Sequence, residues 1–138
     1  MLKEDWKTLA EHRLSTAMEN YRAAINLQAA DMYRIANNRA YYSMFHSMRA
    51  VLALEGKDFK KHSSLLGYFN QQYISTDIFP RELSKRITQA SVIRNESDYN
   101  DFYIVNKSET QEQVESAKIV YDTVSSYLES RFAEAGEG

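Results

Sequence analysis

Apolar side chains recur every three or four residues along most of the chain, and this spacing constrains the fold more than any other feature. In the first segment the recurring residues are Trp6, Ala10, Leu14, Ala17, Tyr21 and Ala24. An α-helix turns once every 3.6 residues, so it places such residues on one face. The 138 residues include only 4 Gly and 1 Pro, which would interrupt helices. The spacing therefore predicts an all-helical protein whose first helix covers about residues 4–28.

A second helix is predicted between two turn-forming residues. Asp31 can cap its N-terminus, and Gly56 suits its C-terminal stop. Its predicted inner face comprises Tyr33, Asn37, Ala40, Tyr41, Met44, Met48, Val51 and Leu52. A helix with this many inward residues is expected to lie at the centre of the protein.

The C-terminal half contains three further amphipathic segments. The third helix should run from Ser63 to about Ile74, and the fourth should have Pro80 in its first turn and extend towards Arg94. The pattern "SETQ", which begins at Ser108, is a capping box for the last helix. Together the segments predict an all-α, four- to five-helix up-and-down bundle in a single domain, residues 1–138, with a frayed tail from about residue 132. The predicted core comprises Leu14, Tyr21, Met44, Met48, Phe69, Ile87, Val120 or Tyr121, and Val124.

Composition excludes several functional classes. The absence of Cys argues against disulfides and thiolate metal sites, and the formal charge of -2 argues against a broadly basic nucleic-acid surface. The charged N-terminal segment does not resemble a secretory signal, and no long apolar run predicts a membrane span, so we expect a cytoplasmic location. No nucleotide-binding loop or metal-ligand motif occurs, and we expect no metal and no cofactor.

Three stretches, taken in order, carry a family resemblance. They are "NNRAYYSMFHSMRAVLALEGKDFKKHSS", "FPRELSKRI" and "RNESDYNDFY". Their combination resembles the HEPN domain superfamily, in particular its small stand-alone prokaryotic members. The resemblance implies a helical bundle that forms a homodimer and, in many members, a toxin of a toxin-antitoxin pair that cleaves RNA without a metal. It also implies a small nucleotidyltransferase as partner.

The active motif of this family is an Arg, commonly followed by a polar residue, with a His four to six residues after the Arg. By this resemblance Arg94 matches the Arg, Asn95 matches the polar residue, and Tyr99 stands where a His would be. Arg94 can still bind a phosphate. A Tyr side chain has an ordinary pKa near 10, so it is almost wholly protonated at neutral pH and cannot replace a His as general base. We therefore expect phosphate binding to survive better than catalysis, with weak or absent RNA cleavage.

Other residues offer a second possible site. Arg39, Tyr42, His46 and Arg49 share one side of the second predicted helix, opposite its apolar face. They could bind phosphate, or they could form a polar seam against another helix or a second subunit. His62 follows two Lys and could help a helix cap or join a phosphate site, and Asp98 could form an ion pair with Arg94. The aromatic residues of "DYNDFY" could line or plug a groove.

Two functional interpretations remain open. The first is a toxin or defence protein that binds RNA or a nucleotide phosphate near Arg94, with any general base supplied by His46, His62 or a partner. The second is a non-catalytic, dimeric interaction module that binds a small nucleotidyltransferase.

Overall fold

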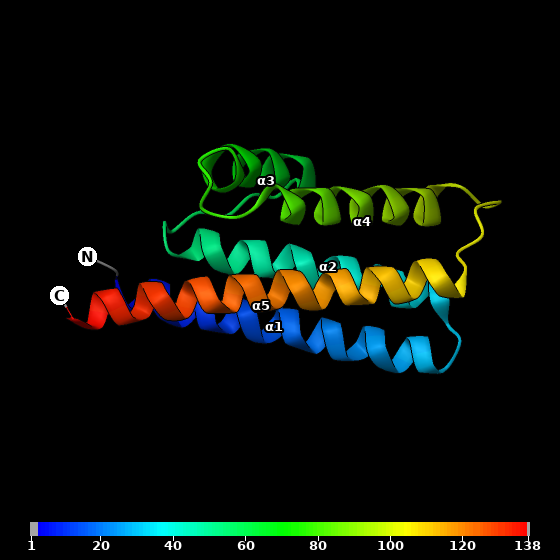
Figure 1. The fold of residues 1–138 in the computed structure, drawn as a ribbon, viewed down its shortest axis with the longest axis horizontal. Coiled ribbons are helices and arrows are strands. Elements are labelled where there is room, and N and C mark those ends of the chain that lie inside the picture. Colours follow the sequence, from blue (N-terminus) through cyan, green and yellow to red (C-terminus); the bar gives the residue numbers. More distant parts are fainter. Residues whose placement is uncertain (1–2, 138) are drawn as a thin grey trace.

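The computed structural model describes residues 3–137, and helices account for most of them (Figure 1). The elements are α1 (Glu4–Ala29), α2 (Tyr33–Ala53), α3 (His62–Phe69), the π-helical turn η1 (Asn70–Ile74), α4 (Arg81–Tyr99) and α5 (Lys107–Glu137). No strand occurs among the described residues. The prediction of an all-α bundle is confirmed. Helix α5 continues through Glu137, into the segment for which the sequence predicted fraying, and Gly138 lies outside the described residues.

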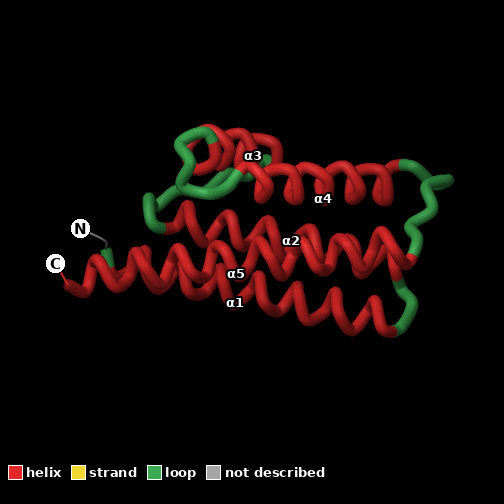
Figure 2. The backbone as a smooth tube through the Cα atoms, in the orientation of Figure 1, coloured by secondary structure: helices red, strands yellow, loops and turns green. Residues whose placement is uncertain are grey.

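Three long helices, α1, α2 and α5, run side by side, and α3 and α4 cover the side of α2 that α1 and α5 leave open (Figure 1). The described ends of the chain meet at one end of the bundle, and the α1–α2 and α4–α5 connections lie at the other (Figure 2). Helix α2 contacts α1, α3, α4 and α5. Ser43, Phe45, Ser47 and Ala50 are accordingly buried as well as the predicted inner face, because this helix has neighbours all round.

The core agrees with the apolar spacing. Six of its predicted members are buried, namely Met44, Met48, Phe69, Ile87, Val120 and Val124. Leu14 and Tyr21 are partly buried and pack against this core. None of the described helices is long and apolar enough to span a membrane.

Two predicted helix caps are wrong. The N-cap of α2 is Met32 rather than Asp31, which adopts a left-handed backbone conformation (φ 60°) and accepts a hydrogen bond from the Tyr33 hydroxyl. Helix α5 begins before the "SETQ" pattern, and the Asn106 side chain accepts a hydrogen bond from the Glu109 amide at 2.7 Å. Polar residues are common near helix starts, so pattern alone does not choose among neighbouring candidates.

Gly56 ends α2, as predicted. The turn that follows requires a left-handed backbone conformation, which residues other than Gly adopt poorly. Its φ is +67°, and a Cβ placed there would lie 2.7 Å from the Trp6 ring. This close packing fixes the start of the connection between α2 and α3. The connection then delivers His62 to the first turn of α3, facing α2 and α4.

Candidate functional site

Arg94 projects from α4 onto the surface of α2. The buried residues Leu83, Ile87 and Ala90 precede it at helical spacing, so the same face of α4 reaches α2 at Arg94. Its Nη2 donates to the Tyr42 hydroxyl at 3.3 Å, and the centre of its guanidinium lies 5.2 Å from the Tyr41 ring and 5.5 Å from the Tyr42 ring. These cation–π contacts hold the charge at a half-buried position.

Asp98 lies beside the Nε edge of the Arg94 guanidinium. Its Oδ2 lies 3.4 Å from Arg94 Nε, which is an ion pair one helical turn apart, although the two atoms are not aligned as a hydrogen bond. The expected pairing with Asp98 is therefore present. It leaves Nη1 and Nη2 directed at other groups, so the ion pair fixes Arg94 without using its whole hydrogen-bonding capacity.

His62 meets Arg94 from a different helix. Its Nδ1 lies 3.0 Å from the Tyr41 hydroxyl and 3.5 Å from Arg94 Nη1. Its ring stacks on Phe45 with 4.1 Å between centroids, and meets Tyr42 edge-on at 5.8 Å. Among the described residues, Nε2 has no hydrogen-bond partner. We call Arg94, His62, Tyr41, Tyr42 and Phe45 the Arg94 cluster.

The cluster controls the charge of its titratable groups. Burial, followed by the nearby Arg94 charge, lowers the pKa of His62, so the imidazole is neutral at neutral pH. Burial raises the pKa of Tyr41 against the opposing effect of Arg94, so the phenol also stays neutral. The cluster thus presents one cation beside a neutral imidazole, and both pack against aromatic rings.

The second candidate site is a half-buried seam rather than an open stripe. Asp58 accepts hydrogen bonds from Arg49 Nε at 3.1 Å and Nη2 at 2.7 Å, and Arg49 Nη1 lies 3.3 Å from His46 Nδ1. Arg13 of α1 donates to the Arg49 carbonyl at 2.8 Å and pairs with Asp58 at 3.4 Å. Burial first, then the charges of Arg49, Arg13 and Arg39, lower the pKa of His46 to about 4. Of the two interpretations of this stripe, the polar seam against another helix agrees with these contacts to α1.

Arg39 joins the two groups of residues. Its guanidinium lies 4.9 Å from the Tyr42 ring, and its Nη1 donates to Asn20 of α1 at 3.0 Å. Tyr42 therefore contacts both Arg39 and Arg94. Of the second predicted site, the structure brings Arg39 and Tyr42 to the Arg94 cluster, while His46 and Arg49 pair within the seam.

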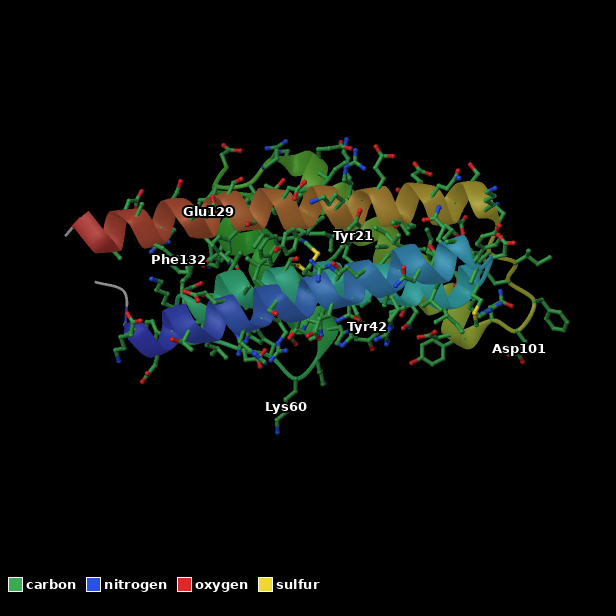
Figure 3. The ribbon with its side chains drawn as sticks, turned by 90° about the horizontal axis from the view of Figure 1, so that it is seen from below. Tyr21, Tyr42, Lys60, Asp101, Glu129 and Phe132 are labelled. Carbon is green, nitrogen blue, oxygen red and sulfur yellow. The ribbon has the colours of Figure 1, made fainter. Side chains whose placement is uncertain are left out.

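Asn95 and Tyr99, which follow Arg94 in the motif, do not gather around it, unlike Asp98. Five residues turn an α-helix by about 140° beyond a full turn, so Tyr99 lies on a different face of α4 from Arg94. Tyr99 is 80% exposed, and Asn95 is also exposed. Tyr99, the last residue of α4, and the loop residues after it up to Ile104 form what we call the end loop, residues 99–104, where Phe102 is 92% exposed. Figure 3 shows Asp101 projecting from the end of the bundle, far from Tyr42 near its middle.

Sequence reasoning offered His62 as one of three possible sources of a base for the Arg94 site, beside His46 and a partner. It placed Tyr42 in the second possible site, assigned Tyr41 to the core and did not single out Phe45. One available signal was the spacing of Tyr41 and Phe45, which places two aromatic rings on one face of α2 next to Tyr42. No signal in a single sequence places the turn before α3 against that face.

The Arg94 cluster is largely buried, since Tyr41 is fully buried, Phe45 is 7% exposed and the Arg94 side chain is 18% exposed. A groove of about 660 Å³ lies between η1 and α4, lined in part by Ile74, Arg81 and Lys85, and it does not include Arg94. Within the described part of the chain, no group of three or more metal-ligating side chains is placed to hold a metal ion. The cluster's chemistry is that of a fixed cation and a neutral imidazole, which suits an anion.

Comparisons with known proteins agree with this architecture. The HEPN domain model matches residues 5–127. "Putative toxin MJ0142" of Methanocaldococcus jannaschii is 30% identical over 132 residues, which cover 96% of this chain and 90% of that protein. A UPF0332 protein of Thermotoga maritima is 28% identical over 94 residues, which cover 68% of this chain and 71% of the relative.

A solved structure shows the same fold. ST0689, described as an archaeal HEPN homologue, superimposes with a TM-score of 0.70 at 14% identity and covers 86% of this chain and 97% of its own. At this identity the likeness concerns the fold alone. The family match spans four of the helices and most of the fifth. The chain therefore belongs to the HEPN domain family.

Proposed function

We propose that this protein is a toxin-type HEPN protein that binds RNA through a backbone phosphate at Arg94. The observation that carries the proposal is the way Arg94 is held. Its guanidinium rests on two tyrosine rings, with Nη1 and Nη2 turned towards His62 and Tyr42. A planar guanidinium fixed in this way is prepared to donate two parallel hydrogen bonds to a phosphate.

The surroundings favour a polymer over a small enclosed ligand. Lys60 and Lys61 are exposed in the turn just before His62, and Figure 3 shows Lys60 extending outwards from the side of the bundle that carries Tyr42. With a net charge of -2, the chain can attract RNA only through such a local group of cations.

The relatives supply the class of function. The first relative is named as a toxin, and so is a second Methanocaldococcus jannaschii protein, "Putative toxin MJ0605", which is 29% identical over 122 residues. The family resemblance implies RNA as the target of such toxins. Together they support RNA as the polymer whose phosphate Arg94 binds.

The test is fluorescence anisotropy with a labelled single-stranded RNA oligomer whose riboses are 2′-O-methylated, so that it cannot be cleaved through its 2′-hydroxyls. Arg94→Ala should weaken binding by about 10- to 100-fold, because a charged hydrogen-bonded contact contributes about 1.5–3 kcal/mol. It should also make the slope of log K against log salt shallower by about 0.7, the value for one phosphate of a single strand. The matched control is Arg22→Ala, which removes an exposed arginine of α1.

Equal binding by wild type, Arg94→Ala and Arg22→Ala would overturn the proposal. Binding that falls equally in both variants would show only a general effect of charge, and would overturn it too.

The end loop favours a second candidate function, a protein-interaction module. Tyr99, Phe102 and Ile104 are 80%, 92% and 83% exposed, and adjacent apolar side chains this exposed favour a protein partner. The partner would be a second copy of the chain or a small nucleotidyltransferase. Light scattering tests the homodimer directly. A particle of about twice 16.0 kDa that returns to 16.0 kDa when the three residues are changed to Ser supports it, and a 16.0 kDa wild type contradicts it.

A further inference from the structure

We infer that the groove between η1 and α4 binds a small amphipathic carboxylate, a molecule with one carboxylate group and an apolar body. The groove lies where the start of α4 meets the segment that follows α3 (Figure 1). Its volume of about 660 Å³ is within the range of small-molecule sites. Arg94 does not line it, so the inference goes beyond the proposed RNA function and does not rest on it.

The two walls of the groove are fixed by contacts within the protein. Ser84 of α4 donates a hydrogen bond to Asn70 Oδ1 of η1 at 2.8 Å, which joins the walls. Tyr73 of η1 is buried, and its hydroxyl donates to Glu55 at 2.5 Å. These contacts position η1 from both sides. A groove held in this way is formed before a ligand arrives, which lowers the entropic cost of binding.

One wall is an irregular helical turn. The Ser75 amide donates to the Asn70 carbonyl at 2.9 Å, five residues back, which is the hydrogen bond of a π-helix. Such turns are rare and occur frequently at functional sites. This turn contributes Asn70 and Ile74 to the groove, and Ser75 follows it. The departure from regular α-helix therefore coincides with the groove.

The inside of the groove is suited to an apolar group. Its exposed surface is mainly apolar, and Ile74, which is 7% exposed, forms part of the floor. The aliphatic stems of Arg81 and Lys85 add to this surface. Ser84 and Asn70 already pair with each other. An apolar body placed here would leave water without displacing a polar contact, which favours binding.

The charges at the groove suit one anionic group. Arg81 and Lys85 are exposed, lie one turn apart on α4, and form no ion pair within the described part of the chain. Arg86 of the same helix differs, because it pairs with Glu82 at 3.6 Å and donates to Ser116 of α5. Two cations without an acidic partner complement a carboxylate, which an arginine binds through two parallel hydrogen bonds.

The length of the groove favours a small molecule over a protein segment. Its α4 wall runs from Arg81 to Gln89, which is about 12 Å of helix. A specific protein interface buries more than about 1,000 Å² in total. A short groove with charges at one end and an apolar floor instead fits a ligand that has a carboxylate at one end.

The test is an NMR titration of the ¹⁵N-labelled protein with octanoate. Octanoate should bind wild type with a dissociation constant of about 1 mM or lower, a value in keeping with its size. It should shift the amide signals of Ser75 and Lys85, one from each side of the groove. Two other probes separate the parts of the ligand. 1-Octanol, which lacks the charge, and acetate, which lacks the apolar body, should each bind at least about tenfold more weakly.

Variants test the charge and the apolar floor separately. Arg81→Gln should weaken octanoate binding by about three- to tenfold, because it removes a charged but exposed contact. Thr88→Trp puts a large ring into the groove, retains both cations, and should weaken binding by more than about tenfold. The matched control is Arg22→Gln, which removes an exposed arginine of α1 and should leave binding unchanged. Thermal melting followed by circular dichroism establishes that each variant folds.

Several results would overturn the inference. Equal affinity for octanoate and 1-octanol would contradict the role of the two cations, and wild-type affinity in Thr88→Trp would place the ligand elsewhere. A wild type that does not bind octanoate would also overturn it. If light scattering then gave a particle of about twice 16.0 kDa that Thr88→Trp reduced to 16.0 kDa, the groove would be assigned to a second copy of the chain instead.

Discussion

Arg94 and Tyr99, the first residue of the end loop, are only five residues apart in sequence, yet the Arg94 cluster and the end loop differ in packing and in chemistry. In the cluster, Arg94 is 18% exposed and contacts side chains from α2 and α3. In the end loop, Tyr99 and Phe102 are 80% and 92% exposed. Besides Asp98, one helical turn away, Arg94 contacts residues 32 and 52 positions away along the chain. A motif written as consecutive letters can thus divide between two environments, because helical geometry and tertiary packing decide which residues meet.

The largest expected difference between the two regions is the effect on stability of removing one phenylalanine ring from each. Phe45→Ala should lower the free energy of unfolding by about 3–5 kcal/mol, because it leaves a cavity under His62 in a buried position. Phe102→Ala should change it by less than about 0.5 kcal/mol, because the ring is almost fully exposed. Urea unfolding of both variants measures the contrast. Similar losses in the two would mean that the end loop is packed in solution, against this protein or a second copy.

The second difference concerns how the free energy of unfolding depends on pH below neutrality. The folded state holds the pKa of His46 at about 4, against an ordinary value of 6.5, so the unfolded state binds the proton more readily between these values. The stability associated with neutral His46 is therefore present above about pH 6.5 and is lost as pH falls towards 4. Its upper value is about 3 kcal/mol, which solvent screening reduces.

His46→Gln should flatten this acid dependence of the free energy of unfolding, as measured by urea titrations at several pH values. His12→Gln is the control, since it changes an exposed histidine of the same chain. A wild-type-like slope in His46→Gln would show that carboxylates, rather than the seam around Asp58, cause the loss of stability in acid.

The smallest contrast compares two tyrosine hydroxyls. Tyr42→Phe removes the oxygen to which Arg94 Nη2 donates, and should weaken binding of the 2′-O-methyl oligomer by about two- to tenfold, the equivalent of one hydrogen bond. Tyr99→Phe should leave binding unchanged. The reverse ranking in anisotropy measurements would return the site to the "RNESDY" motif.

Sequence reasoning predicted the elements better than the site. The extents of α1, α3 with η1, and α4 follow from apolar spacing, since each helix buries one face in the core. The cap of α5 was placed at Ser108 rather than Asn106, because several polar residues there could serve. The sequence left His46, His62 and a partner open as neighbours of Arg94. The choice of His62 depends on how the Gly56 turn returns the chain over α2, which a single sequence does not show.

The most direct measurement is NMR of the histidine rings, with and without the 2′-O-methyl RNA oligomer. We expect the His62 ring signals to shift and the pKa of His62 to rise when RNA binds, because the phosphate offsets the Arg94 charge. The signals of exposed His12 should not move. RNA binding that leaves His62 unchanged and instead perturbs the signals of Tyr99 and Phe102 would contradict the assignment of the site to the Arg94 cluster.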